Sequence, residues 1–249
     1  MLNFKTTLSQ YIKFLKLSGF YKKKNILKYE LTIEKLQNWK KSDFNQLLQW
    51  YLDIKKKNKA KIKIKHLEKL KKWNYDKKKG ILYHSSGGFF SVIGLEVKNA
   101  GREINNWDQP LIKQKNYVGG VIGLVRKKIN NIPHYLVEAK FEPGNYNVIQ
   151  ISPSVQATYS NLDQVHKGSR NKIINAYFKK KFKTVRKIWV SEDGGRLYKK
   201  RNLHWIINSE KKIIKLPKTY KWITLWEINQ FMKKGTYVGP HLRAILSLI

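Results

Sequence analysis

The hydrophobic pattern divides the chain into two regions with different periodicities. From Leu2 to about Lys72 the sequence is rich in Leu, Lys, Glu, Gln and Asn, contains Gly19 as its one glycine and lacks proline. Apolar residues recur within their segments at spacings of three and four, which gives each helix one buried stripe. The members of this stripe are Leu36, Trp39, Leu47, Trp50, Tyr51 and Ile54. The pattern predicts a helical N-terminal region over residues 1–72, for packing or dimerisation, with Ser42 as the cap of one helix.

After Trp73, short runs of β-branched and aromatic residues alternate with turn signals such as Lys79-Gly80 and Asp193-Gly194-Gly195. The predicted strands are Gly80 to His84, Phe89 to Leu95, Val118 to Lys128, His134 to Phe141, Asn147 to Ile151 and Leu203 to Ile207. The third and fourth of these should form a hairpin.

Two helices are predicted in the same region, over residues 169–182 and 224–233. Thr224 opens the second one, and Glu227 stands three residues later, which is a capping-box pattern. The expected class is therefore α+β: a mixed or antiparallel sheet flanked by helices, formed by residues 73–249 and preceded by the helical region.

The charge of the chain is strongly positive. It has 52 Lys+Arg against 16 Asp+Glu, a formal net charge of +36. Such a surface attracts anions, and a basic nucleic-acid-binding protein is one interpretation. The excess, however, is mostly Lys in short runs without a patterned stripe, which is typical of an AT-rich genome. No specific nucleic-acid partner is expected, whereas a nucleoside diphosphate would benefit from the same field.

Several kinds of site are excluded by absent residues or motifs. Cysteine is lacking, which rules out disulfides, thiolate zinc sites and cysteine nucleophiles. Rossmann, P-loop, H-E-x-x-H and G-x-S-x-G patterns are missing, and the six histidines show no metal-ligand spacing, so no metal is expected. The amino terminus has no signal-peptide-like apolar stretch, and no segment approaches the roughly 18 apolar residues of a membrane span. A soluble cytoplasmic protein without membrane contact is the expectation.

One stretch carries polar residues where a strand-rich core would not. Residues 138–145 read E-A-K-F-E-P-G-N, residues 148–161 read V-I-Q-I-S-P-S-V-Q-A-T-Y-S-N, and Val165-His166 follow. This stretch resembles the core of the NDP-hexose 2,3-dehydratases, which read close to A-K-x-E-P-G-N, V-Q-L-S-P-T-V-Q-A-T-x-S-N and V-H-x-G. The similarity extends upstream to residues 84–95 and to Trp107-Asp108-Gln109-Pro110, and downstream to residues 192–202 and 222–225.

The resemblance implies a Nudix-like fold and a dehydratase activity. The Nudix box itself, with its paired glutamates, is missing, so metal-dependent pyrophosphate hydrolysis is not expected. Gly88 stands where the family pattern has Arg, and residues 239–243 keep Arg243 of the N-M-D-x-R pattern but lose its acid. Family members carry two related modules, whereas this chain has one, and a homodimer could replace the duplication.

The implied substrate is a nucleoside diphosphate 4-keto-6-deoxyhexose, with dTDP as the expected nucleotide. The C4 ketone acidifies the C3 proton, and the C2 hydroxyl leaves by β-elimination, a route that needs neither metal nor redox cofactor. Glu142, at a strand end before a turn, is the expected base, and Lys140, on the same face, the expected stabiliser of the enolate. His166 or Tyr159 is the expected acid. The alternative for Lys140 and Glu142 is a structural ion pair.

The remaining candidates would bind substrate. Among them we expect neutral hydrogen-bond donors and acceptors for the sugar and two arginines for the phosphates. Residues around the sugar are expected to stack on the substrate or to make polar contacts with it. They are Gln150, Ser152, Gln156, Thr158 and Asn161 for the sugar; Trp107, Gln109 and Asn145 around it; and Arg196 and Arg201 for the diphosphate. Trp107 is equally consistent with a core position. The alternative functions are a catalytically inactive nucleotide-sugar-binding relative and the basic nucleic-acid-binding protein.

Overall fold

The computed structural model describes residues 3–36, 39, 43–114, 119–164, 172–178, 182–209 and 215–249. The helices are α1 (Phe4–Leu17), α2 (Ile26–Glu34), α3 (Phe44–Lys57), α4 (Tyr159–Leu162), α5 (Leu225–Met232) and α6 (Pro240–Leu246), with the short turns η1 (Lys23–Asn25) and η2 (Leu67–Lys69) and the π-helical η3 (Ile174–Phe178). The strands are β1 (Trp73–Asp76), β2 (Ile81–His84), β3 (Phe90–Val97), β4 (Trp107–Gln114), β5 (Gly120–Ile129), β6 (Ile132–Phe141), β7 (Ile149–Pro153), β8 (Val155–Thr158), β9 (Lys183–Ser191), β10 (Arg201–Asn208) and β11 (Tyr220–Ile223).

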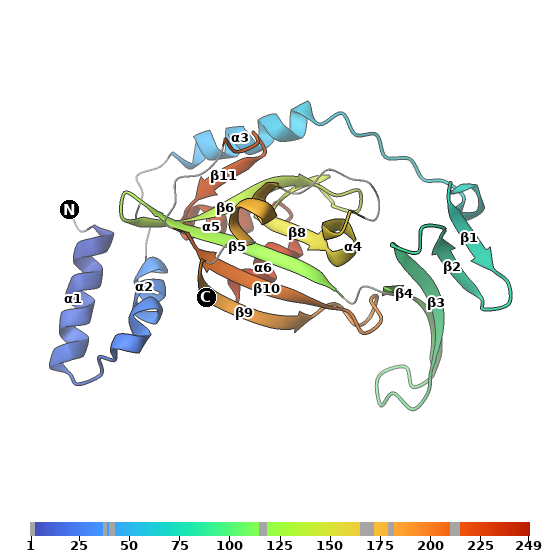
Figure 1. Ribbon diagram of the computed structural model, residues 1–249, viewed down its shortest axis with the longest axis horizontal. Helices are drawn as coiled ribbons and strands as arrows, with labels where there is room; N and C mark the ends of the chain where they lie inside the picture. Colours follow the sequence, from blue (N-terminus) through green and yellow to red (C-terminus); the bar gives the residue numbers. More distant parts are fainter. Residues whose placement is uncertain are drawn as a thin grey trace.

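The strands form two sheets (Figure 1). The smaller sheet has the order β1-β2-β3-β4 and lies at one end of the molecule. The larger sheet has the order β11-β6-β5-β10-β9, with β7 beside β6 and β8 beside β5. Because β10 runs parallel to β5 while the other pairs are antiparallel, the larger sheet is mixed. The predicted α+β class, with helices before the sheets, is confirmed.

The β5–β6 hairpin organises the larger sheet. The predicted pairing is confirmed, and the turn is tighter than expected: Asn130 and Asn131 alone join Ile129 to Ile132. Both asparagines have positive φ, 49° and 63°, as a type I′ turn requires at its two central positions. Asparagine tolerates this left-handed conformation better than most residues, so the turn residues fix the hairpin register.

The two hairpin strands part halfway along their length. Val125–Ile129 pairs with Ile132–Leu136, but from Val137 onward β6 pairs with β7, and over 120–123 β5 pairs with β8. The strands β7 and β8 are joined only by Ser154, so one bent segment fills the gap between the diverging strands. Gly120 permits the close pairing with β8, since a Cβ there would lie 2.3 Å from the Ala157 carbonyl oxygen.

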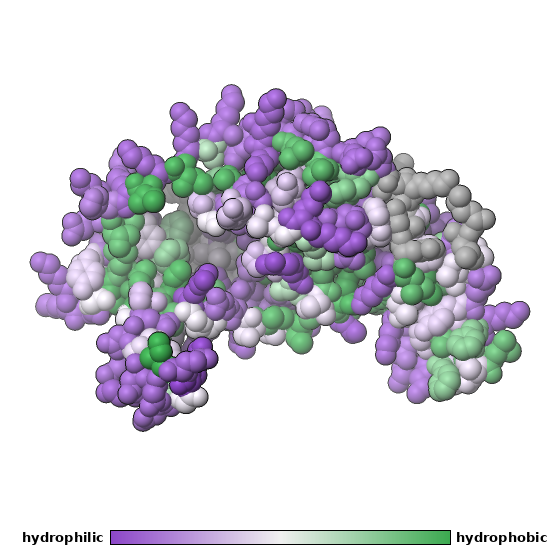
Figure 2. All heavy atoms as spheres, turned by 180° about the vertical axis from the view of Figure 1, so that it is seen from behind, coloured by the Kyte–Doolittle hydropathy of each residue, from purple (hydrophilic) through white to green (hydrophobic). Residues whose placement is uncertain are grey.

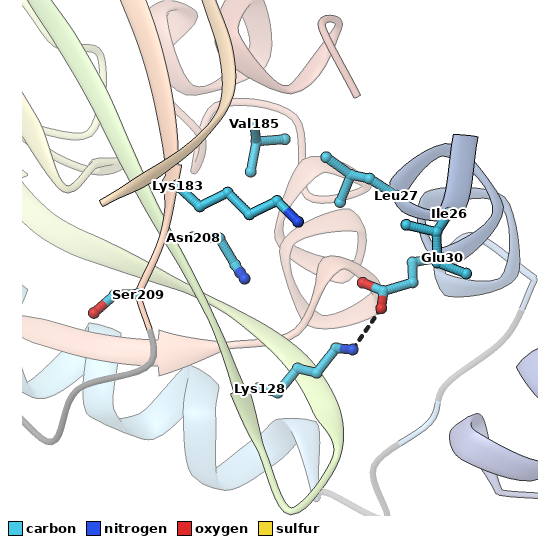
Figure 3. Close-up of a pocket in the computed structure, with 8 residues that line it drawn as sticks. All are labelled: Ile26, Leu27, Glu30, Lys128, Lys183, Val185, Asn208 and Ser209. Carbon is cyan, nitrogen blue, oxygen red and sulfur yellow. Dashed lines mark hydrogen bonds and ion pairs between the residues drawn. The ribbon is translucent and has the colours of Figure 1, made fainter. Parts of the chain in front are cut away.

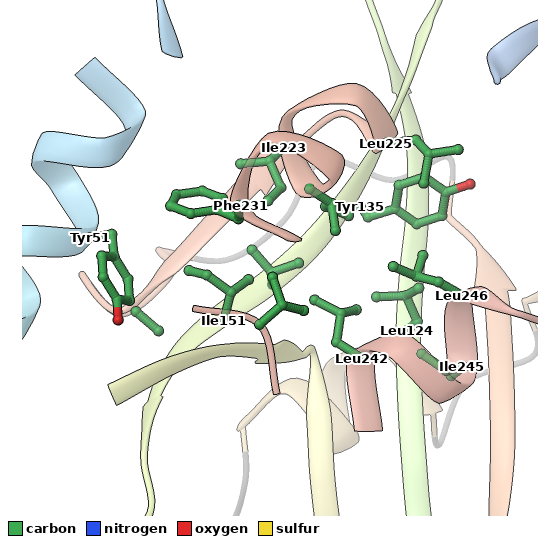
Figure 4. Close-up of a cluster of buried hydrophobic side chains, with 14 of the residues drawn as sticks. Tyr51, Leu124, Tyr135, Ile151, Ile223, Leu225, Phe231, Leu242, Ile245 and Leu246 are labelled. Carbon is green, nitrogen blue, oxygen red and sulfur yellow. The ribbon is translucent and has the colours of Figure 1, made fainter. Parts of the chain in front are cut away.

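Two apolar clusters cover opposite faces of this sheet. The main core cluster joins α3, α5 and α6 to odd-numbered residues of β6 and β7, and it includes Tyr51, Tyr135, Phe231 and Leu242 (Figure 4). The second core cluster joins η3 to the other face and includes Tyr177. Strand alternation separates the two sets.

The helical predictions were partly right. In α3, Leu47 and Tyr51 are buried as expected, but Asp43 is the N-cap, its side chain accepting a hydrogen bond from the Asn45 amide at 2.9 Å. The prediction of Ser42 as cap is therefore wrong; carboxylate and hydroxyl oxygens both suit this role, and sequence alone gave no choice between adjacent residues. The capping box at Thr224 is confirmed, with both reciprocal bonds present. Of the predicted helix over residues 169–182, residues 172–178 are helical, and residues 169–171 and 179–181 lie outside the described residues.

Helix α2 is attached to the sheet by ion pairs. The fully buried Arg126 guanidinium lies 3.1 Å from Glu34 and 3.3 Å from Glu30, and Lys128 lies 2.5 Å from Glu30. Burial raises the pKa of Glu34, an effect that the nearby Arg126 charge opposes. A cavity of about 300 Å³ lies beside these pairs, between α2 and the ends of β9 and β10, and Lys183 extends into it (Figure 3).

The surface is hydrophilic over most of the face seen from behind, with hydrophobic patches toward both ends of the molecule (Figure 2). The exposed apolar side chains include Phe14, Leu17 and Phe20 on α1 and the following loop, and Phe89 and Phe90 at the start of β3. Among the described helices, none combines the length and the apolar character needed to cross a bilayer.

We expect Arg126→Ala to lower the free energy of unfolding by about 3 to 5 kcal/mol, because it leaves the buried Glu34 carboxylate without its counter-charge. Urea denaturation measures this change. Arg102→Ala is the matched control, since Arg102 pairs with Glu103 on the surface; its effect should stay below about 1 kcal/mol. Equal effects of the two substitutions would contradict the role given to Arg126.

Candidate active site

Lys140 and Glu142 lie side by side at the end of β6. The Lys140 Nζ is 2.7 Å from the Glu142 Oε1, and the two side chains keep 23% and 37% of their surface exposed. Alternation along the strand puts both on the even-numbered face, as predicted from their spacing. Gln156 of β8 joins them: its amide donates to the Glu142 carboxylate at 3.3 Å, and its carbonyl accepts from the Lys140 Nζ at 3.3 Å.

Strand β7 adds two buried polar residues beside this pair. Gln150 is the cross-strand neighbour of Lys140, and its amide donates to the Thr236 carbonyl at 2.7 Å. Ser152 is also buried, and the Gly239 backbone lies against both side chains. The segment before α6 reaches them because the Ile151 and Gly239 amides form backbone bonds between β7 and residues 237–239. The start of α6 is thus fixed next to Lys140 and Glu142.

A second group of polar residues comes from the β9–β10 hairpin and from α6. His241 Nδ1 lies 3.6 Å from Glu192 Oε1, and the Asn202 amide donates to the same carboxylate oxygen. His204 is 2% exposed, and its Nδ1 is buried without a hydrogen-bond partner. Asn202 and His204 are two residues apart on β10 and therefore share a face.

Electrostatics connects the two groups. Burial lowers the pKa of His241, and the positive charges of Lys200 and Lys140 lower it too. The negative charges of Glu192 and Glu142 act in the opposite direction and raise this pKa. We call the whole set the fork cluster, since it lies where β5 and β6 part. Its members are Lys140, Glu142, Gln150, Ser152, Gln156, Glu192, Lys200, Asn202, His204 and His241. Within the described ranges, no group of three or more His, Asp or Glu side chains is arranged to hold a metal ion.

The upstream candidates Trp107 and Gln109 are linked by hydrogen bonds to the β9–β10 loop. The Trp107 indole donates to the Gln109 side-chain oxygen at 2.7 Å, and the Gln109 amide donates to the Gly195 carbonyl at 2.9 Å. Backbone bonds from Ile112 to Arg196 and from Tyr198 to Ile112 hold the same contact between β4 and the β9–β10 loop. The loop also carries Glu192, so the smaller sheet reaches the edge of the fork cluster through it.

Four other candidates lie in turns or helix ends. The Asn145 backbone closes the turn after Glu142, with bonds of 3.1 Å and 2.9 Å. Thr158 caps α4 by accepting from the Asn161 amide. Tyr159 packs against the second core cluster, with its ring 6.4 Å from that of Trp189. These placements give Asn145, Thr158 and Asn161 local structural contacts; His166 lies outside the described residues.

The two arginines expected at a diphosphate contact other side chains than those of the fork cluster. Arg196 is exposed and pairs with Asp193 at 3.7 Å. Arg201 stacks on the Trp189 ring at 4.9 Å, and strand alternation places it on the face of β10 opposite Asn202 and His204. The sequence could not show which face of β10 each residue occupies.

Sequence reasoning missed Glu192, Asn202, His204 and His241 as site residues. Glu192 and Asn202 do belong to the stretch 192–202 that resembles the dehydratases, which is the signal that could have singled them out. In the sequence, His241 stood out only because residues 239–243 depart from the family pattern N-M-D-x-R. Its position depends on the contact between β7 and residues 237–239. No local sequence feature predicts this contact.

Comparison with known proteins gives the class of protein to which this site belongs. A sequence model of NDP-hexose 2,3-dehydratases matches residues 44–249, and the chain belongs to this family. Among named relatives, dTDP-4-dehydro-6-deoxy-α-D-glucopyranose 2,3-dehydratases from Saccharopolyspora spinosa and Amycolatopsis orientalis are 34% and 31% identical over 73% and 72% of this chain. A third, from Streptomyces violaceoruber, is 27% identical over 83% of it.

These relatives are longer proteins. The aligned segments cover 37%, 39% and 46% of their lengths, so the chain spans less than half of each. Among solved structures, a Nudix hydrolase from M. smegmatis aligns with 62% of this chain and 97% of its own, with a TM-score of 0.33 and 10% identity.

We expect Glu192→Gln to lower the pKa of His241 further, because the carboxylate that stabilises the imidazolium is removed, and Lys200→Met to raise it, because a neighbouring positive charge is lost. Heteronuclear NMR titration of the His241 ring measures both shifts, and unchanged backbone amide spectra away from α6 serve as the fold control. Shifts in the same direction for both variants would contradict the arrangement described.

Proposed function

We propose that the chain catalyses the removal of the C2 hydroxyl from a nucleoside diphosphate 4-keto-6-deoxyglucose, with dTDP as the nucleotide. The family membership of residues 44–249 and the activity by which three relatives are named support this reaction class. The observation that carries it is the ion pair of Lys140 and Glu142, partly exposed at the end of β6 within the matched region.

The reaction needs a base, a stabiliser of negative charge and a proton donor. In the proposed route the Glu142 carboxylate accepts the C3 proton, and the electron pair moves onto the C4 oxygen. The C2–O bond then breaks with uptake of a proton, releasing water and leaving a C2=C3 enol. The enol gives the 3,4-diketo-2,6-dideoxy sugar by moving a proton to C2. The oxidation at C3 balances the reduction at C2, so the route requires no external electron carrier.

Lys140 would stabilise the enolate. A fixed ammonium that faces the C4 oxygen acts most strongly on the charge that develops there during proton removal. Its present contacts, Glu142 and the Gln156 carbonyl, hold it beside the base. Substrate would have to displace part of this ion pair, and the partial exposure of both side chains makes them accessible for that exchange.

The neutral side chains of the cluster suit a sugar. Gln150, Ser152 and Gln156 present amide and hydroxyl groups close to Lys140, and hydroxyls of a hexose can both donate to and accept from them. Tyr159 and His166 stay the predicted proton donors from the sequence. A homodimer also stays a prediction.

We expect Glu142→Gln to lower the rate of dideoxy sugar formation by about 100-fold or more, because the base is removed while its shape is kept. Lys140→Met should cost about 100- to 1000-fold, the effect typical of a lost charge stabiliser. The assay follows the conversion of dTDP-4-keto-6-deoxyglucose, with the unstable diketone trapped chemically.

The matched controls are Glu96→Gln and Lys98→Met, which break an exposed ion pair of the same spacing at the end of β3. Both should leave the rate unchanged within about twofold. If the Lys140 and Glu142 variants behave like these controls, the pair is structural and the assigned roles are wrong. If the unsubstituted protein binds the nucleotide sugar without converting it, the activity itself is refuted in favour of an inactive binding relative.

A further inference from the structure

We propose that His241, positioned by Glu192, donates the proton that the departing C2 hydroxyl takes up. The inference rests on the proposed dehydratase function and assigns its third role to a residue that the sequence did not single out. It follows from the position of His241 within the fork cluster and from the groups that surround its ring.

The first support is geometric. His241 stands at the start of α6, which the backbone bonds of residues 237–239 fix against β7. At Gly239, two residues earlier, an added Cβ would lie 3.4 Å from Ser152 Oγ and 3.6 Å from Gln150 Oε1, and Gln150 is the direct cross-strand neighbour of Lys140. The ring therefore comes from a different element than Glu142, and this element begins beside β7, the strand next to Lys140, which suits a second proton-transfer group.

The second support is the orientation of the ring. Nδ1 faces Glu192 Oε1 at 3.6 Å, and Glu192 is itself held by the Asn202 amide and by a backbone bond from its own amide to the Lys200 carbonyl at 3.0 Å. A carboxylate on one ring nitrogen fixes the ring and stabilises its protonated form. Nε2 is then the nitrogen left to transfer a proton.

The third support is the charge around the imidazole. From the β9–β10 hairpin it faces Glu192, Lys200 and His204, and from β6 it faces Lys140 and Glu142. Burial and the two lysines make the imidazolium a stronger acid than a free histidine, whereas the two carboxylates oppose this effect. A stronger acid transfers its proton more readily to a leaving oxygen.

The proposed step balances as follows. Glu142 holds the proton taken from C3, and the enolate charge lies on the C4 oxygen. The enolate electrons form the C2=C3 bond as the C2–O bond breaks, and the proton on His241 Nε2 moves to the leaving oxygen to give water. His241 becomes neutral and Glu142 neutral, and the charge state is restored when one proton returns from solvent and one leaves Glu142.

The test separates proton removal from elimination in D2O. Loss of the H3 signal by ¹H NMR reports removal of the C3 proton, and the trapped dideoxy product reports elimination; a sample without protein corrects for spontaneous exchange. We expect His241→Gln to keep H3 loss near the unsubstituted rate and to lower product formation by about 100-fold or more. His66→Gln, at an exposed histidine outside the fork cluster, is the control, and we expect it to change neither rate by more than about threefold. Tyr159→Phe is compared with it, because Tyr159 is the competing predicted proton donor.

The pH profile tests Glu192 as the positioning residue. An acid must be protonated to act, so product formation should fall as pH rises through the pKa of His241, while H3 loss, which does not use the His241 proton, should continue. Glu192→Gln removes the charge that raises this pKa, and should move the fall in product formation to lower pH. His241→Gln should abolish this pH-dependent fall.

Three results would overturn the inference. They are unchanged product formation in His241→Gln, a parallel loss of H3 exchange and product that leaves their ratio unaltered, and a selective loss of elimination in Tyr159→Phe instead. Failure of the unsubstituted chain to remove H3 or form product has a different meaning, because it refutes the proposed function itself and the inference with it.

Discussion

The structure depends on one buried hydroxyl at the point where β5 and β6 part. Ser154, fully buried, donates to the Leu136 carbonyl at 2.5 Å and accepts from the Val125 amide at 2.9 Å. Without it, a buried donor and a buried acceptor on the two diverging strands would lack partners, at a cost of about 1 to 3 kcal/mol each. Because the hydroxyl satisfies both, the chain can bend between β7 and β8, and Gln156 arrives beside Lys140 and Glu142. The position of the active residues is thus a consequence of how the sheet divides.

Carboxylates are few in this chain, which has 52 Lys+Arg and 16 Asp+Glu. Glu34 and Glu30 bind Arg126 and attach α2 to the sheet. Within the fork cluster, Glu142 binds Lys140, and Glu192 binds Asn202 and His241. The positive surface attracts anions from a distance. These few acids pair with particular Lys, Arg and His side chains and so fix where those positive charges lie within the fold. The net charge of the chain does not determine these positions.

Local features of the sequence predicted the parts of the structure that depend on residues close together in the chain. The β5–β6 hairpin, the capping box at Thr224 and the shared face of Lys140 and Glu142 all follow from short-range spacing, and the structure has them. Strands β1, β4, β8, β9 and β11 were not predicted. Pro110 makes β4 unlike a strand. In β9, apolar residues and Lys or Arg do not alternate, and most of the strand is exposed. Glu192 and His241 meet only through tertiary contacts across the sheet, and the face occupied by Arg201 depends on a register that spacing does not reveal.

The central claim is the proposal that one hexose ring binds between the Lys140–Glu142 pair of β6 and the Glu192–His241 pair of the fork cluster. A crystal structure of the Glu142→Gln variant with dTDP-4-keto-6-deoxyglucose tests this most directly, since that variant should retain the substrate without converting it. The account predicts the C4 oxygen in contact with the Lys140 ammonium and the C2 hydroxyl in contact with the His241 ring. A sugar bound elsewhere, for example on the smaller sheet, with the fork cluster untouched, would contradict it.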